Sequence, residues 1–301
     1  MSKSFKDANP EAEVYMLQDK CNMKKMPFSS YSELEGMGVK IVEGVLTGAT
    51  ASSEVPAAIK DVKFDYIVDN WSKNSQNASF VIDIAKVSST KQLTFISSAG
   101  MYKTSGLTPI VEEDPVKEND ARKVELQIIA SAVPYTMLRP QYIYGTKSNK
   151  RYLDYFIGRA YRKLHTPLPL SGEQLVCLTH VEDVASLITA AIGNDKAKNQ
   201  IFNCGTDRYI SYKGLSQTIH KKLGNADADM KYMYYEPKDF DHWDGSGVME
   251  FPFRRETFIT SPGKARLLLG WKPKHTVEGD MEAEIKDYEV SVGLHILITS
   301  F

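Results

Sequence analysis

The chain of 301 residues is long enough for one large domain or two smaller ones, and its 42% of apolar side chains can build a sizeable core. Its 37 basic and 38 acidic side chains give a formal charge of −1, which excludes the broad positive field of a dedicated nucleic-acid binder. Three scattered cysteines exclude a disulfide framework, and the absence of any apolar run of about 18 residues predicts no membrane span.

The chain starts with MSKSFKDANPEAEVYML, which contains neither an apolar signal segment nor an Arg-rich transit composition. This stretch is typical of the end of a helix that runs into a strand. A nucleotide-binding sheet normally starts with a strand, a Gly-rich turn and a helix, because the glycines let backbone N–H groups approach a pyrophosphate. Nothing of that kind precedes Glu13, so we expect the first strand and its Gly-rich loop to be missing from this chain.

Short apolar runs then alternate with amphipathic stretches, which predicts a doubly wound, Rossmann-like α/β fold with a parallel sheet. The predicted strands are 13–17, 39–42, 64–68, 93–96, 135–138 and 201–204, and the predicted helices are 72–87, 119–130, 152–163 and 181–192. We expect residues 1–145, completed by about 178–208, to form the core. Residues 146–177 and 209–301 are predicted to form a smaller lobe.

Several polar residues fall where predicted strands end, which is the edge at which open α/β sheets bind ligands. Asp69 ends the strand in FDYIVDN, where its carboxylate would repel a pyrophosphate and could recruit Mg²⁺, or could cap the helix that starts near Ser72. Ser97 and Ser98 end the next strand, in FISSAGMYKT, which invites a catalytic interpretation. A strand-end serine can equally cap backbone groups.

Arg139 ends the strand in MLRPQYIYG and Tyr142 follows it toward the lobe interface, which makes both of them, with Asp69, candidate cofactor-binding residues. The planar guanidinium of Arg139 could clamp the phosphate of a nucleotide or of RNA, or it could form an ion pair that pins the lobes together. His180 and Asp183 lie three residues apart on one face of a helix start, where Asp183 complements the helix dipole. Two such residues do not make a metal site, so the identity of any metal stays open.

Two segments interleave cations and aromatic rings. Lys24 and Lys25 are close in sequence to Phe28 and Tyr31, and the second segment contains Lys147, Lys150, Arg151 and Tyr152. This mixture suits single-stranded RNA, because cations neutralise phosphates while rings stack on bases. Charged surface loops of this kind are also common without any ligand.

Four stretches in order resemble the extended short-chain dehydrogenase/reductase superfamily, which includes NAD-dependent epimerases and dehydratases: FISSAGMY, MLRPQYIYG, HVEDVA and KARLLLGWKP. Within it, the chain is most similar to the chloroplast stem-loop binding proteins. The stretches that carry this likeness are KKMPFSSYSEL, FDYIVDN, RPQYIYG, IFNCGTDRYISYKGL, YYEPKDF and FPFR. The resemblance covers about residues 24–288.

The superfamily resemblance implies a serine that orients the substrate, and a tyrosine four residues before a lysine that transfers a proton. Ser98 matches the serine and Lys123 the lysine, but Asn119 stands at the tyrosine position. An asparagine has no tunable pKa, so we expect a degenerate site without hydride transfer. Since the Gly-rich loop is also missing, we expect no tight binding of NAD(P) by this chain. Lys123 could also lie on a solvated helix face.

The subfamily resemblance implies an RNA-binding protein of the chloroplast stroma that acts in RNA processing, with a metal-assisted stem-loop endoribonuclease activity for which Mg²⁺ is the candidate metal. It also implies an oligomer and a place in a plastid assembly such as the ribosome. Two alternatives stay open: an NAD(P)-dependent nucleotide-sugar epimerase or reductase, and a catalytically silent scaffold. Fold alone does not decide among these functions.

Overall fold

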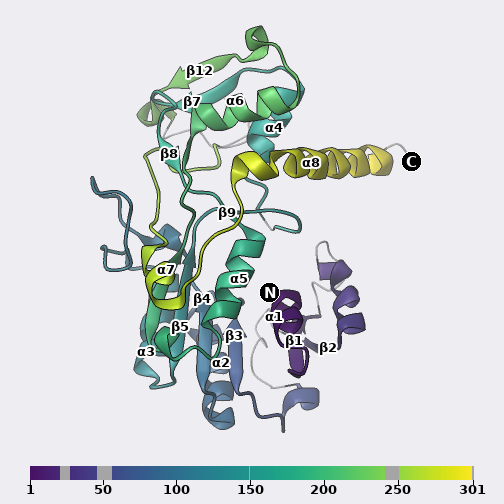
Figure 1. The fold of residues 1–301 in the computed structure, drawn as a ribbon, viewed down its shortest axis with the longest axis vertical. Coiled ribbons are helices and arrows are strands. Elements are labelled where there is room, and N and C mark those ends of the chain that lie inside the picture. The colour runs from purple at the N-terminus through teal and green to yellow at the C-terminus, as the bar shows by residue number, and fades with distance from the viewer. Residues whose placement is uncertain (21–27, 46–55, 149, 241–250, 300–301) are drawn as a thin grey trace.

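The computed structural model describes residues 1–20, 28–45, 56–148, 150–240 and 251–299. Its centre is a parallel four-stranded sheet in the order β10-β5-β4-β3 (Figure 1). These strands are β3 (Tyr66–Asp69), β4 (Gln92–Ile96), β5 (Tyr135–Pro140) and β10 (Gln200–Cys204). The predicted doubly wound α/β fold with a parallel sheet is therefore confirmed.

Helices cover both faces of this sheet because successive strand residues point to opposite sides. Phe95 and Met137 pack with α2 (Ser75–Ser88) and α3 (Asp120–Ala130) in one apolar cluster. Leu138 and Phe202 pack with α5 (Val181–Ala191) and α7 (Gly263–Leu269) in a second cluster. Both faces of the sheet are buried, as expected for parallel strands.

The helix expected from Ser72 starts three residues later, at Ser75. Asp69 Oδ1 accepts hydrogen bonds from the backbone N–H groups of Trp71 and Ser72, both at 2.9 Å. These groups are thus satisfied in a turn outside the helix. Asn74 caps the helix instead, because its side chain accepts from the N–H of Asn77.

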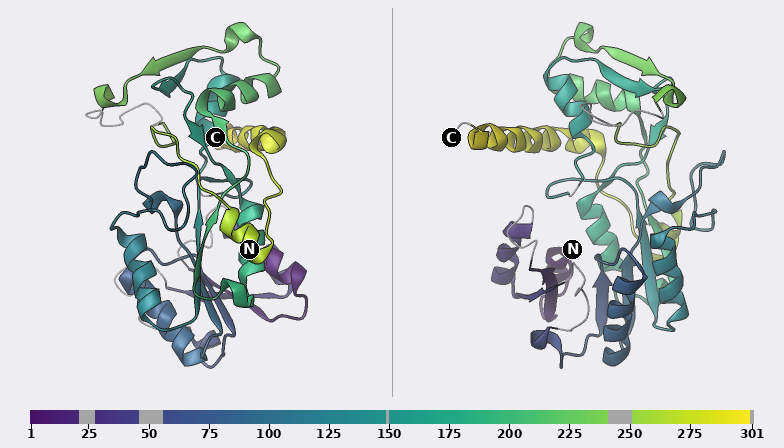
Figure 2. Two further views of the ribbon diagram at one scale, coloured as in Figure 1. Left: turned by 60° about the vertical axis from the view of Figure 1, so that its left-hand side comes forward. Right: turned by 180° about the vertical axis from the view of Figure 1, so that it is seen from behind.

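The N-terminal elements form a separate parallel pair of strands, β1 (Val14–Asp19) and β2 (Val39–Gly44), which lies on the β3 side of the larger sheet (Figures 1 and 2). Within the described ranges no ladder joins β1 to β3. The short helix α1 (Ser2–Ala8) contacts α5, where the hydroxyls of Ser4 and Thr189 are 3.2 Å apart. The 3₁₀ segments η1 (Phe28–Met37) and η2 (Ala57–Ile59) complete this part of the chain.

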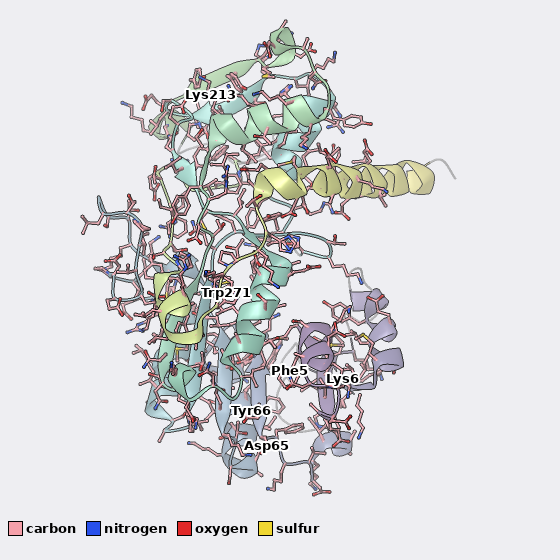
Figure 3. All side chains as sticks on the ribbon, viewed as in Figure 1. Phe5, Lys6, Asp65, Tyr66, Lys213 and Trp271 are labelled. Carbon is pink, nitrogen blue, oxygen red and sulfur yellow. The ribbon has the colours of Figure 1, made fainter. Side chains whose placement is uncertain are left out.

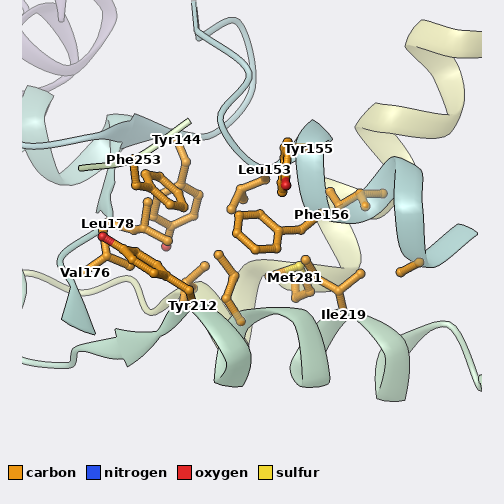
Figure 4. Packing of buried hydrophobic residues seen from close by; sticks show 14 of the residues in the cluster. Tyr144, Leu153, Tyr155, Phe156, Val176, Leu178, Tyr212, Ile219, Phe253 and Met281 are labelled. Atoms are coloured by element: carbon orange, nitrogen blue, oxygen red, sulfur yellow. The ribbon is translucent and has the colours of Figure 1, made fainter. Parts of the chain in front are cut away.

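A second group of helices and strands forms an upper lobe in Figure 1, around an aromatic cluster that includes Tyr155, Phe156, Tyr212 and Phe253 (Figure 4). Its helices and strands are α4 (Asp154–Tyr161), β7 (Thr166–Pro169), β8 (Leu175–Val176), β11 (Ile210–Ser211), α6 (Tyr212–Lys222), β12 (Tyr232–Tyr235) and α8 (Val277–Thr299).

The smaller elements are β6 (Ile143–Tyr144), β9 (Thr179–His180), and the 3₁₀ turns η3 (Ala99–Met101), η4 (Asp195–Ala197), η5 (Asp227–Asp229) and η6 (Pro237–Phe240). Strands β6 and β9 pair in parallel between the large sheet and the upper lobe. None of the helices in the described part of the chain is both long and apolar enough to cross a membrane.

Candidate functional site

The two serines at the end of β4 have different surroundings. Ser97 is buried, and its hydroxyl donates to Glu125 Oε1 at 2.7 Å. Ser98 is exposed, and its hydroxyl accepts from the N–H of Gly100 at 3.1 Å, which caps η3. The Ser97 hydroxyl thus has a structural partner in the core, and the Ser98 hydroxyl has one in the local backbone. The catalytic role expected of Ser98 stays a prediction.

Arg139 lies inside a buried polar network rather than on an open surface. Its guanidinium, with 2% of the residue exposed, binds Glu125 through two hydrogen bonds of 2.9 and 2.7 Å. It also donates to Tyr102 Oη at 2.9 Å and to the carbonyl of Glu112 at 3.2 Å. The ion pair joins α3 to β5, both within the sheet core, so it does not pin the two lobes together as one interpretation predicted. A phosphate would have to displace Glu125 to reach it.

The network also sets the protonation states of its members. Burial works to raise the pKa of the Glu125 carboxyl, but the hydrogen bonds and charge of Arg139 lower that pKa overall. Burial raises the pKa of Tyr102 to about 12, against the opposing effect of Arg139. Glu125 is thus ionised and Tyr102 neutral at ordinary pH. Neither group is poised to exchange a proton with a ligand near pH 7.

Asn119, which stands where the superfamily resemblance implies a tyrosine, lies at the start of α3. Asn119 is the N-cap of this helix, and its Oδ1 accepts from the N–H of Arg122 at 3.0 Å. Lys123 is exposed and forms an ion pair of 3.0 Å with Asp120 on the same helix. Asn119 therefore has a structural role for which a tyrosine would be a poor choice. The described contacts of Lys123 do not connect it with Ser98.

Asp69 lies where the dinucleotide implied by the superfamily resemblance would bind. The residue is 4% exposed at the carboxyl end of β3, and its Oδ2 has no hydrogen-bond partner among the described residues. The backbone N–H groups of Trp71 and Ser72 satisfy Oδ1 only, so a diphosphate bound at this edge would meet the unpartnered Oδ2. Asp69 therefore disfavours a diphosphate at the end of β3. One unpartnered carboxylate does not make a Mg²⁺ site either, because this ion binds through several oxygens in an octahedron.

Tyr142 belongs to an aromatic group that covers the strand ends. Its ring lies 4.9 Å from that of Phe253 and 5.2 Å from that of Tyr152, measured between centroids. Its hydroxyl accepts from the N–H of Arg254 at 2.8 Å. The Arg254 side chain in turn donates to the carbonyls of Gly100 and Tyr102 at 2.7 and 3.0 Å.

The segment around Arg254 therefore lies over the turn that follows Ser98. The guanidinium of Arg254 also stacks on the ring of Phe258, at 3.8 Å from its centroid. In the sequence, Arg254 stands out only as the last residue of FPFR, a stretch that carries the family likeness. Two phenylalanines next to an arginine suggest a buried or stacked position, but they do not predict which backbone carbonyls Arg254 contacts.

His180 and Asp183 gain partners from distant parts of the chain. The ring of His180 stacks on that of His275 with centroids 3.8 Å apart. The carboxylate of Asp183 accepts from the N–H groups of Lys274 and His275 at 2.9 and 3.0 Å. His275 Nδ1 lies 3.1 Å from Asp280. Asp183 therefore holds the segment before α8 against the start of α5, in addition to its position near the helix N-terminus.

The ligand atoms of His180, His275 and Asp280 lie within 4.8 Å of one another, which is close enough for metal ligands. However, His180 Nδ1 accepts from the N–H of Glu182 at 3.2 Å, so a neutral His180 carries its proton on Nε2. A proton on Nε2 and a second ring stacked face to face both oppose coordination. Burial and the charge of His275 lower the pKa of His180, whereas Asp280 raises the pKa of His275 against its burial.

Of the two segments predicted to bind RNA, the structure describes the second, which contains Lys147, Lys150 and Arg151. Lys24 and Lys25 lie outside the described residues. Lys147 pairs with Glu33, Arg151 pairs with Asp154 and Asp287, and Lys150 lies 6.0 Å from the centroid of the Tyr152 ring. Nearby, burial and the charge of Asp287 raise the pKa of Glu284 to about 7. Carboxylates thus surround the predicted patch at Lys147, Lys150 and Arg151.

Comparisons with known proteins agree on the fold. The model of the NAD dependent epimerase/dehydratase family matches residues 55–205. The UDP-glucose 4-epimerase of Thermotoga maritima has 15% sequence identity and a TM-score of 0.73, with 97% of this chain and 96% of that chain covered. A dTDP-glucose 4,6-dehydratase of Bacillus anthracis also has 15% identity and a TM-score of 0.73, with 94% and 90% covered. At such identities the likeness concerns the fold alone.

A nearer relative in sequence is the 41 kDa chloroplast stem-loop binding protein b of Arabidopsis thaliana. It is 30% identical over 262 residues, which cover 85% of this chain and 67% of that protein. The predicted resemblance is therefore confirmed at both levels, the broad family and the chloroplast relative.

Proposed function

The chain belongs to the NAD dependent epimerase/dehydratase family, and we propose that it works there as a chloroplast RNA-binding protein rather than as a nucleotide-sugar enzyme. The Arabidopsis relative is named for stem-loop binding in the chloroplast. This likeness supports both the ligand class and the location. The enzymes of the same fold are far more distant in sequence, at 15% identity.

The observation that carries the proposal is the N-cap role of Asn119. Nucleotide-sugar chemistry in this fold needs a proton-transferring side chain, and the loss of such a group costs about 10²- to 10⁴-fold in rate. The side chain of Asn119 has no titratable proton, and its oxygen is occupied by the N–H of Arg122. Lys123, which would assist that group, is engaged with Asp120 in solvent.

The contacts around the strand ends support the same conclusion. Glu125 binds Arg139, and the segment that contains Arg254 covers the turn after Ser98. Together with the buried carboxylate of Asp69, they favour a protein that does not depend on NAD(P).

The experiment uses the full chain and a fluorescently labelled stem-loop RNA, with anisotropy measured between about 50 and 200 mM salt. We expect weak binding whose affinity falls as salt rises, with a slope of about 0.7 to 0.9 for each phosphate contact. A parallel titration with NADH should give no saturation in the micromolar range. Incubation of the same RNA with Mg²⁺, followed by a denaturing gel, tests whether binding leads to cleavage.

Two results would contradict the proposal. Micromolar binding of NADH together with turnover of a nucleotide sugar would favour the enzyme alternative. Absence of RNA binding at about 50 mM salt, where electrostatic attraction is strongest, would favour a scaffold within a plastid assembly.

A further inference from the structure

A group of cations lies at the outer end of the upper lobe, where the turn after α4, the end of α6 and the start of β12 meet. We call it the α4–α6 surface, and its members are Arg159, Arg162, Lys163, Lys221, Lys222 and Lys231. Lys213, at the opposite end of α6, is not part of it (Figure 3).

Hydrogen bonds show that these segments are neighbours. Asn225, which follows α6, donates to the carbonyl of Ala160 at 2.8 Å. The N–H of Thr166 donates to the carbonyl of Lys231 at 2.8 Å, and Lys163 pairs with Asp229 at 3.0 Å. The cations of the three segments therefore share one region of the molecule.

The charge of this region differs from that of the whole chain. Residues 155–172 and 212–226 contain no carboxylate at all. The acidic side chains that approach are Asp229, which pairs with Lys163, Glu282, which pairs with Lys222, and Asp227, which adjoins them in η5. Six cations thus meet three carboxylates, in a chain whose overall charge is −1. The C-termini of α4 and α6 add about half a negative charge each, which is too little to balance the excess of positive charge.

The ion pairs do not close the surface to a ligand. Both partners of Lys222–Glu282 are exposed, as is Lys163, and such pairs contribute little free energy and exchange readily. Among the described residues Arg162 and Lys221 form no salt bridge. The hydrogen bond from Lys163 and, to a lesser degree, the charge of Lys231 lower the pKa of Asp229, without a salt bridge between Lys231 and Asp229. The guanidinium of Arg159 stacks on the Tyr155 ring, 3.8 Å from its centroid, which fixes its position.

An exposed aromatic ring lies within the same surface. Tyr161 is 52% exposed, and the neighbouring Leu164 is 51% exposed. Arg162 and Lys163 follow Tyr161 directly in sequence, so phosphate-binding groups and a ring are side by side. Exposed rings flanked by cations are the arrangement with which proteins stack unpaired bases and hold the adjoining backbone.

The loop that contains Lys147, Lys150 and Arg151 is a weaker candidate. Its three cations lie among Glu33, Asp154, Glu284 and Asp287, so carboxylates outnumber cations there. A phosphate chain approaching this loop would be repelled as much as attracted.

We propose that the α4–α6 surface is the site where this protein binds the single-stranded or loop region of an RNA, with Tyr161 stacking on a base and the surrounding cations contacting phosphates. This inference rests on the proposed function, because it takes RNA as the ligand. It places the interface on the upper lobe, away from the strand ends at which this fold presents its nucleotide site.

The test replaces Arg162, Lys163 and Lys221 together by Gln and measures binding of the labelled stem-loop RNA across the salt series. We expect a loss on the order of a hundredfold near 0.1 M salt and a salt slope flatter by about two units, since each contact contributes about 0.7. The matched control removes the same charge elsewhere, by changing Lys147, Lys150 and Arg151 to Gln. It should keep affinity close to that of the wild type.

A second pair of variants tests the ring. Tyr161→Ala should weaken RNA binding by about fivefold or more without changing the salt slope, whereas Tyr161→Phe should keep the affinity. All replaced side chains of the α4–α6 surface in these variants are exposed, and unchanged circular dichroism melting curves would verify the fold.

These measurements distinguish failure of the proposed RNA-binding surface from failure of the proposed function. If the wild type binds RNA and the α4–α6 triple variant binds equally well, this surface is not the RNA site, and its charge would instead suit an acidic protein segment. If the control triple loses as much affinity, the location is likewise wrong. If the wild type itself does not bind RNA, the proposed function fails, and this inference fails with it.

Discussion

At the scale of single residues, the buried pair of Glu125 and Arg139 has the largest energetic consequence. Two hydrogen bonds join the charges, and both side chains are almost completely removed from water. Removing one partner of such a pair leaves the other charge buried and uncompensated. Arg139 is therefore more important for stability than for contact with a ligand.

We predict that Glu125→Gln lowers the free energy of unfolding by about 3–5 kcal/mol, because Arg139 keeps its charge and loses the carboxylate. Urea denaturation followed by circular dichroism measures the effect. Lys123→Gln on the same helix serves as the control, because its ion pair with Asp120 is exposed and should contribute about 0–1 kcal/mol. Equal denaturation midpoints for both variants would contradict the prediction.

At the scale of elements, the sequence predicts well what depends on local periodicity. The six expected strands and four expected helices of the alternating pattern are present, with ends displaced by a few residues. Helices α6 and α8 were not predicted, because residues 209–301 were assigned to a smaller lobe without individual helices. Strands β7 and β12 pair between segments more than 60 residues apart, which local patterns do not encode.

The candidate site was predictable to a lesser degree for the same reason. The sequence located Ser98 and Arg139 at the sheet edge, because strand ends are local features, and it located Lys123 on a helix through the family resemblance. Their partners come from elsewhere in the fold: Glu125 reaches Arg139 from a helix, and His275 reaches His180 across 95 positions. Contacts of this kind decide whether a polar residue is structural or available to a ligand.

Asp183 connects two elements, and we predict that Asp183→Ala lowers the free energy of unfolding by about 2 kcal/mol or more. The change leaves the N–H groups of Lys274 and His275 without an acceptor, at about 1–3 kcal/mol for each unsatisfied group. Thermal melting would measure the loss. Asp183→Asn keeps one acceptor oxygen and should lose less.

The matched control for Asp183 is Glu182→Gln, in the same turn of α5. The Glu182 side chain is 74% exposed, so its replacement should have a small effect. If Asp183→Ala and Glu182→Gln melt at the same temperature, the connection between α5 and the segment before α8 contributes little to stability.

At the scale of the whole molecule, apolar burial is distributed unevenly. The four-stranded sheet is covered on both faces, and Leu93, Met137 and Phe202 are fully buried there. In contrast, α1 has no buried residue, and Asp19 is the single buried residue of β1. In β2, Val39 and Val42 are the buried apolar residues, so the N-terminal pair of strands buries fewer apolar side chains than the larger sheet.

The separation of the two sheets has a consequence for how the native state opens. Backbone amides exchange with deuterium when their segment unfolds locally, and segments with little apolar burial open at a lower free energy. We expect the amides of β1 and β2 to exchange much faster than those of β4 and β5, by a local opening that leaves the larger sheet intact. Native-state exchange followed by mass spectrometry would measure both rates in one sample. Equal lifetimes for the amides of β1 and β4 would mean that the two sheets open together, as one cooperative unit.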